Sequence, residues 1–284
     1  MVMLIKNNLS ESFVAVMDFL PLISKTNSEV FSALMDSNLS VKKLSEVINK
    51  DHSLSARILA LANSPVYGFS KKISTIEMAI SILGFEAVKD LVIGFSIINS
   101  TLEDKDRYFI ADAFNKHSYV CGYIAQLLAN DFDYPVRNEA FVAGLLHDIG
   151  IAVIHRYMNK EFTLISEMKF YRKLNQTRAE KLILGKTHSD IGAEVATKWF
   201  FPDSLIDAIK FHHSPSQANS NTKLVAIVHL ADFIASKEAP QYLLSSEDEP
   251  LDKSVIEILK IPDESYLFDL INNVSILIKS MNLI

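Results

Sequence analysis

The sequence predicts an all-α protein. Over long stretches, apolar residues recur at intervals of three and four rather than in alternation, which is the spacing of amphipathic helices. The chain of 284 residues contains 8 Gly and 8 Pro, so few positions interrupt such helices. Its length and its hydrophobic share of 49% suffice for a substantial core. We therefore expect helices that pack on helices.

Short helices are predicted for the first third of the chain, with Ser or Asn near several starts and Pro65 and Gly68 as turn formers. The expected segments are 28–37, 40–50, 53–64, 75–84 and 85–100. A polar stretch near residue 100 is the best internal boundary. It separates an N-terminal helical part, 1–105, from a core, 106–240, which C-terminal helices, 241–284, follow. Because the first third has more apolar side chains than short helices bury alone, we expect it to pack against the core.

Longer helices are predicted beyond the boundary, and their ends carry recognisable signals. Gly150 is a natural stop for one helix, and Thr187 with Asp190 resembles a capping box. Pro202 and Pro215 bracket another helix. The expected segments are 114–130, 138–150, 161–174, 187–200, 202–215, 223–237, 254–260 and 264–281.

Charge and cysteine content restrict the function classes. With 28 basic and 34 acidic residues the formal net charge is -6, which opposes broad nucleic-acid binding and leaves room for a local basic pocket. The one cysteine, Cys121, excludes an internal disulfide. The N-terminus lacks the pattern of a signal peptide, and no apolar run reaches the length of a membrane span. We expect a soluble cytoplasmic protein without membrane contact.

Potential metal ligands interrupt the apolar faces of several predicted helices. His117, for example, is followed at helical spacing by the apolar residues Val120, Ile124 and Leu128. The stretch GLLHDIG, residues 144–150, places an imidazole and a carboxylate side by side after an apolar run. The residues that interrupt apolar faces in this way are His117, His147, Asp148, His188, His212, His213 and Asp232.

Burial of these polar groups requires partners. An unpaired buried carboxylate costs several kcal/mol, and a buried imidazole needs a hydrogen bond or a cation. A shared site with one or two divalent ions (Fe, Mn, Zn, Ni or Mg) would satisfy all seven residues, with a carboxylate as a bridge. The alternative is that each histidine bonds to a carbonyl or a neighbouring acid. We interpret His52, His155 and His229 as structural or surface residues, and Cys121 as a small hydrophobe.

The ordered motifs HS, LLHDIG, THSDIG, FHHSP and HLAD resemble the HD superfamily of metal-dependent phosphohydrolases, and their order is similar to that of the HD-GYP ligands. Residues 51–84 resemble the N-terminal segment of the HDOD family, an HD-related output domain of bacterial signalling proteins. The resemblance covers roughly residues 15 to 240 and implies an HD-like helical bundle with a His/Asp metal site. HD-GYP enzymes have a lysine where this chain has Ile151, and a GYP element where this chain continues HHSPSQANS.

Two functions follow from the resemblance. The first is a regulatory signal-transduction module that binds a signalling partner protein or a small nucleotide-like ligand, and the two departures favour it. The second is a metal-dependent phosphohydrolase acting on a nucleotide or cyclic dinucleotide phosphodiester, with Asp148 as the catalytic bridge between two ions. In that case Lys186 and Lys210 would contact substrate phosphate, although such lysines are more often solvated surface charges.

Overall fold

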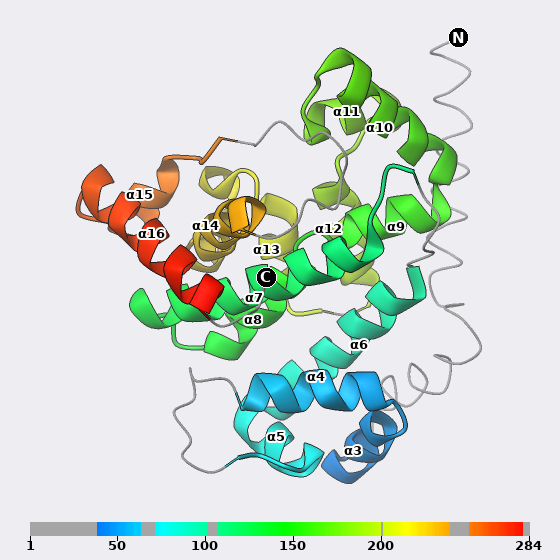
Figure 1. The fold of residues 1–284 in the computed structure, drawn as a ribbon, viewed down its shortest axis with the longest axis vertical. Helices are drawn as coiled ribbons and strands as arrows, with labels where there is room; N and C mark the ends of the chain where they lie inside the picture. The colour runs from blue at the N-terminus through cyan, green and yellow to red at the C-terminus, as the bar shows by residue number, and fades with distance from the viewer. Residues whose placement is uncertain (1–38, 64–71, 102–106, 200, 239–249, 281–284) are drawn as a thin grey trace. The chain divides into compact units, whose positions relative to one another are not determined.

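The computed structural model describes residues 39–63, 72–101, 107–199, 201–238 and 250–280 (Figure 1). Within these ranges the regular structure is helical and contains no strand, which confirms the all-α prediction. The chain divides into two compact units, one of residues 19–100 and one of residues 1–18 with 101–284. Each unit is described by itself below.

The unit of residues 19–100 contains helices that begin and end close to their predicted limits. Its described elements are α3 (Val41–Asn49), α4 (His52–Ala62), α5 (Ile76–Leu83) and α6 (Phe85–Thr101). Ser40 and Thr75 cap α3 and α5 through their side-chain oxygens, as the sequence signals indicate. Gly84, with a φ of 91°, makes the sharp turn between α5 and α6. The predicted helix 28–37 lies outside the described residues.

The second unit begins with α7 (Ala111–Asp131), α8 (Arg137–Leu146) and α9 (Ile149–Tyr157). The prediction of one helix over 138–150 that stops at Gly150 is wrong, because α8 ends at Leu146 and Gly150 lies inside α9. At the break, the Nδ1–H of His147 donates to the carbonyl of Gly144 at 2.7 Å, and Asp148 stands at the N-terminal cap position of α9. The break therefore occurs at the His147–Asp148 pair itself.

The rest of this unit follows the predicted order with two additions, the helix α11 (Gln176–Leu184) and the 3-10 helix η3 (Pro215–Gln217). The helix α11 was not predicted, whereas the capping box of Thr187 and Asp190 at the start of α12 is confirmed. The elements are α10 (Asn159–Arg172), α11 (Gln176–Leu184), α12 (His188–Lys198), α13 (Asp203–Phe211), the short 3-10 helix η3 (Pro215–Gln217), α14 (Thr222–Glu238), α15 (Ser254–Ile258) and α16 (Glu264–Ser280).

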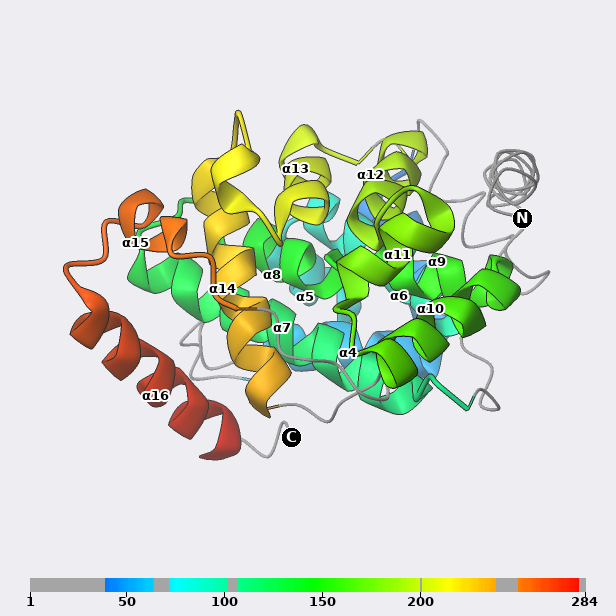
Figure 2. The same cartoon turned by 90° about the horizontal axis from the view of Figure 1, so that it is seen from above.

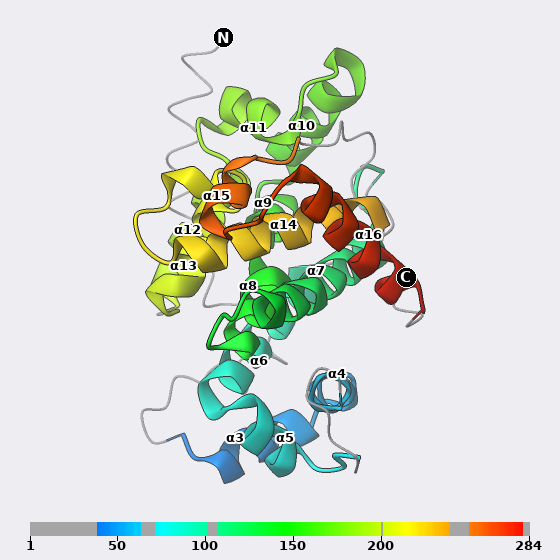
Figure 3. The same cartoon turned by 90° about the vertical axis from the view of Figure 1, so that its left-hand side faces the viewer.

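The core of the second unit consists of two neighbouring helix groups. In one group α7 packs along α8 and is crossed by α14, and in the other α12 packs on α9 and α13 (Figures 2 and 3). Phe114 and Phe141 are among its fully buried side chains. Because the break between α8 and α9 joins the two groups, the His147–Asp148 pair lies between them. In the described ranges, no helix combines the length and the apolar character that crossing a membrane would require.

Candidate metal centre

The seven residues singled out in the sequence converge around the carboxylate of Asp148. Its Oδ2 lies 3.3 Å from the Nε2 of His147, and its Oδ1 lies 3.2 Å from the Nε2 of His188 and 3.5 Å from that of His212. The carboxylate is buried, and each of its oxygens faces a different group of imidazoles. Asp148 therefore stands between two sets of donors.

The first half-site consists of His117, His147 and Asp232 together with Asp148. The Oδ1 of Asp232 lies 3.2 Å from the Nε2 of His117 and 3.4 Å from the Nε2 of His147. The two Nε2 atoms are themselves 3.4 Å apart. The helices α7 and α14 and the break after α8 thus bring four potential ligands to one point.

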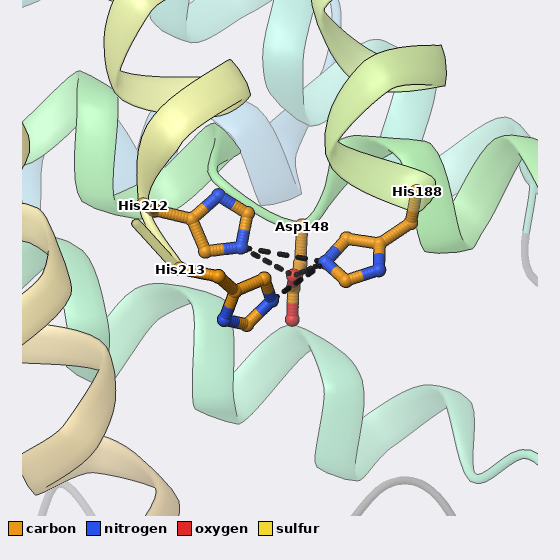
Figure 4. Close-up of side chains that lie close together, drawn as sticks. All are labelled: Asp148, His188, His212 and His213. Atoms are coloured by element: carbon orange, nitrogen blue, oxygen red, sulfur yellow. Dashed lines mark hydrogen bonds and ion pairs between the residues drawn. The ribbon is translucent and has the colours of Figure 1, made fainter. Parts of the chain in front are cut away.

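The second half-site consists of His188, His212 and His213 together with Asp148, and Figure 4 shows the three rings around the carboxylate. The Nε2 of His188 lies 3.3 Å from that of His212 and 3.0 Å from that of His213. His188 is the first residue of α12, and His212 and His213 directly follow α13. Each half-site therefore combines imidazoles with the shared carboxylate.

Two glycines bring the half-sites together. A Cβ atom on Gly144 would lie 2.8 Å from the Cα of Gly122 in α7, and one on Gly150 would lie 1.9 Å from the backbone oxygen of His188. Neither distance leaves room for a methyl group, so α8 approaches α7, and α9 approaches the start of α12, only because these residues are glycine. The two ends of the GLLHDIG segment thus set the position of its His–Asp pair.

The ring orientations fit a metal site. The Nδ1–H groups of His147 and His212 donate to the carbonyls of Gly144 and Ile209, at 2.7 and 2.8 Å, which directs their Nε2 atoms into the cluster. Backbone carbonyls behind the ring are the usual support of a ligating histidine. A tetrahedral ion with bonds of about 2.1 Å places its ligands about 3.4 Å apart, close to the separations in both half-sites. The donor set therefore suits divalent ions that accept nitrogen and oxygen ligands.

Glu180 is a member of the site that the sequence analysis missed. It lies in α11, its side chain is 0% exposed, and its Oε2 accepts hydrogen bonds from both the backbone N–H and the Nδ1–H of His188, each at 2.8 Å. A second carboxylate thus holds His188 from behind. The residue type alone gave no signal, because a buried and an exposed Glu look the same until the packed face of the helix is known.

Burial and charge shift the pKa values of the cluster in opposite directions. Burial lowers the pKa of His188, but Glu180 and Asp148 outweigh it and raise that pKa to about 10. The pKa of His147 is raised well above its usual value for the same reason, with Asp148 as the main cause. Burial and the nearby His213 lower the pKa of His212 to about 3. Without ions, the cluster therefore holds protons on His147 and His188.

These pKa values predict how pH affects stability. His188 binds its proton more tightly in the folded than in the unfolded chain, where its pKa is about 6.5, so its contribution is complete below pH 6.5 and is lost between 6.5 and about 10. We expect the free energy of unfolding of the ion-free protein to fall between pH 7 and 9. Each histidine with a raised pKa should contribute up to about 1 kcal/mol per pH unit to this fall. Urea unfolding in EDTA measures this. With Mn²⁺ in place of EDTA the fall should be smaller, because a cation replaces the protons.

The two lysines predicted to contact phosphate have protein partners. The Nζ of Lys186 forms an ion pair with Glu194 at 2.5 Å, and the Nζ of Lys210 lies 5.2 Å from the centre of the Phe211 ring. Lys186 precedes the first residue of α12 by two positions, and Lys210 is in the last turn of α13. Both are near the chain segments that supply the second half-site, and their contact with a substrate stays a prediction.

The remaining histidines and the cysteine have structural surroundings. His155 is buried and stacks on Phe109 with ring centres 4.3 Å apart. His229 is buried, its Nδ1–H donates to the carbonyl of His212 at 2.6 Å, and its Nε2 accepts from the backbone N–H of Asp252 at 2.9 Å. Cys121 is fully buried, and burial raises the pKa of its thiol. The side chain of His52 lies outside the described part of the chain.

The family model of the HDOD domain matches residues 20–215. The chain belongs to the HDOD domain family. An HDOD domain protein with unknown function from Geobacter sulfurreducens is 23% identical, with 98% of each chain covered and a TM-score of 0.63. A Shewanella amazonensis SB2B protein described as a candidate phosphohydrolase is 26% identical over 96% of this chain and 94% of its own, with a TM-score of 0.65. The HDOD fold of the chain thus agrees with solved structures along nearly its whole length.

Curated relatives of this HDOD protein are longer. An uncharacterized protein of Treponema pallidum (strain Nichols) is 22% identical over 267 residues, which are 91% of this chain and 50% of the relative. Ribonuclease Y of Aquifex aeolicus (strain VF5) is 32% identical over 120 residues, which are 42% of this chain and 16% of that enzyme. The chain therefore spans at most half the length of these two relatives.

Proposed function

We propose that this HDOD protein is a metal-binding regulatory module of bacterial signal transduction. The observation that carries the proposal is the pairing of Nε2 atoms at 3.0–3.4 Å inside each half-site. Two ring nitrogens at such distances need a proton or a cation between them, because a lone pair cannot bond to another lone pair. Seven convergent donor residues, with Asp232 beside His117 and His147, make a divalent ion the better occupant.

In this proposal each half-site holds one ion and Asp148 ligates both. His117, His147 and Asp232 would complete the first half-site, and His188, His212 and His213 the second. The second half-site offers three imidazoles, which suit Fe, Zn or Ni, whereas the two carboxylates of the first also suit Mn or Mg. The ions would connect helices from both groups of the core, so that loading stabilises one arrangement of these helices.

Limited access to solvent supports a regulatory rather than a catalytic role. Five of the seven side chains are almost fully buried, and access is limited to Asp232, whose side chain is 16% exposed, and to the partly exposed His213. Ile151, in the place of the HD-GYP lysine, is buried in the core and offers no charge to a phosphate. A signalling partner protein or a small nucleotide-like ligand would then respond to the loaded or unloaded form.

A metal-dependent phosphohydrolase is the second candidate. The shared carboxylate between two half-sites favours it, and so does the description of the Shewanella amazonensis relative. When bound, the ions would polarise a phosphoryl oxygen and make a nucleophilic hydroxide available near neutral pH. Asp148 would hold both ions, and Lys186 and Lys210 would contact the phosphates of a nucleotide or cyclic dinucleotide.

Metal content and turnover distinguish the two candidates. We expect elemental analysis of protein purified under metal-sparing conditions and then loaded with Mn²⁺, Fe²⁺ or Zn²⁺ to find up to two ions per chain, with a rise in the melting temperature. We expect no turnover of nucleotides or cyclic dinucleotides by the same samples. A protein that takes up no ion would contradict the proposal, and robust ion-dependent hydrolysis would establish the second candidate instead.

A further inference from the structure

The helices α10 and α11 form a hairpin that presents one face to the metal centre and another to solvent. The hairpin lies at the end of its unit opposite α16 (Figures 1 and 2) and packs on α9. Lys173, in the left-handed conformation, ends α10, and the side chain of Asn175 caps α11 by accepting from the N–H of Arg178 at 3.0 Å. These local signals define a short turn and fix the two helices relative to each other.

The inner face of the hairpin is attached to the second half-site through Glu180. Both the ring and the backbone N–H of His188 donate to this one carboxylate, and Gln176, one turn earlier in α11, also donates to it. A buried carboxylate with three donors stays in place only if the donors do. A shift of His188 therefore moves α11 or breaks these bonds.

The outer face of the hairpin combines exposed apolar side chains with an excess of positive charge. Phe170, Tyr171 and Leu182 are 44%, 66% and 60% exposed. Residues 170–182 contain four basic residues, all exposed, and one acidic residue, the buried Glu180. The whole chain has 28 basic and 34 acidic residues, so the residues outside 170–182 include 24 basic and 33 acidic ones. The outer face is therefore basic, whereas the rest of the chain is acidic. The four basic residues are Arg172, Lys173, Arg178 and Lys181.

We propose that the outer face of the α10–α11 hairpin docks an acidic, amphipathic segment of a partner protein, and that Glu180 couples this docking to the loading of the second half-site. The coupling rests on the proposed function, whereas the docking does not. An ion in the second half-site would fix His188, and through Glu180 it would fix α11 in its docking position. A pre-organised face binds with a smaller loss of conformational entropy, so the loaded protein binds the partner more tightly.

The chemistry of the face favours this partner over other anionic ones. Large exposed aromatic and leucine side chains among basic residues are typical anchors for apolar side chains of a protein partner. A polynucleotide would meet repulsion from the acidic remainder of the chain. A second copy of the chain would bring the same basic face, so a symmetric dimer through this face places like charges together.

The test uses the full chain and a fluorescein-labelled synthetic helical peptide that repeats two glutamates and two leucines. Fluorescence anisotropy should show saturable binding, and R178E with K181E should weaken it at least tenfold, because both exposed charges are reversed. The matched control is K42E with K43E, two exposed lysines of α3, which should leave binding unchanged. Any of three results would overturn the docking: no peptide binding up to about 0.2 mM, equal effects of the two double variants, or tighter binding of a polyuridine oligonucleotide or of anionic vesicles.

Coupling is measured by repeating the titration in EDTA and with saturating Zn²⁺. We expect the ion to tighten peptide binding to the wild type at least fivefold, and E180Q to remove that gain. Gln keeps the shape of Glu180 but not its charge. If calorimetry shows that the wild type binds Zn²⁺ without any change in peptide affinity, the coupling is wrong and the proposed function stands. If the wild type binds no ion, the proposed function fails, and the docking is judged from the EDTA titrations alone.

Discussion

Asp148→Ala should remove ion binding from both half-sites at once. The substitution deletes the oxygens that face His147 in the first half-site and His188 and His212 in the second, so each loses its shared ligand. It also removes the main charge that raises the pKa of His147. We expect the affinity for each ion to fall by two orders of magnitude or more, about 3 kcal/mol per site. Calorimetry and elemental analysis measure both occupancies.

Two further variants show whether Asp148 acts as a bridge. His117→Ala removes a ligand of the first half-site alone, so it should lower the number of bound ions from two to one. Asp269→Ala, at an exposed position of α16, should bind ions like the wild type. Circular dichroism must show folded protein in each case. If Asp148→Ala and His117→Ala lose the same single ion, Asp148 is an ordinary ligand and not the bridge.

Gly150→Ala should strongly destabilise the protein. Alanine normally stabilises a helix interior relative to glycine by roughly 1 kcal/mol, but here the added Cβ would lie 1.9 Å from the backbone oxygen of His188. Because backbone atoms must move to relieve this overlap, α9 and the start of α12 have to separate. We expect a loss of about 3 kcal/mol or more in the free energy of unfolding, measured by urea titration in EDTA.

The effect on the metal centre should depend on which glycine is changed. Gly150→Ala moves His188 away from Asp148 and should impair the second half-site, whereas Gly144→Ala pushes α8 from α7 and should impair the first. Ion occupancy measured first with sub-stoichiometric and then with excess Zn²⁺ would distinguish a defect in the first half-site from one in the second. A Gly150→Ala protein as stable as the wild type would show that the two helices can move apart without cost.

Helical periodicity predicted much of the site, because polar residues on an otherwise apolar face can be recognised from spacing alone. His117 and Asp232 were found in this way, and the structure places their side chains 3.2 Å apart. The ordered motifs added the His147–Asp148 pair. Their convergence follows from tertiary packing, which the spacing within one helix does not determine.

Prediction from the sequence failed where one residue type has two structural roles. Glycine ends helices and also allows two backbones to approach closely, and Gly150 was assigned the first role although the structure gives it the second. Glu180 was missed because α11 was not predicted, and its pairing with His188 depends on how α11 folds back on α12. Both errors concern contacts between helices, which local pattern does not specify.

The ring of His229 connects the C-terminal third of the chain to the metal centre through hydrogen bonds. It connects the carbonyl of His212 to the backbone N–H of Asp252, and its neighbour in α14, Asp232, belongs to the first half-site. A fragment trimmed to the matched family region, which ends at residue 215, would keep six of the seven clustered side chains. It would nevertheless lack a carboxylate of the first half-site and leave the His212 carbonyl without its imidazole donor. The smallest fragment worth expressing for metal studies thus extends past Asp252, well beyond the family boundary.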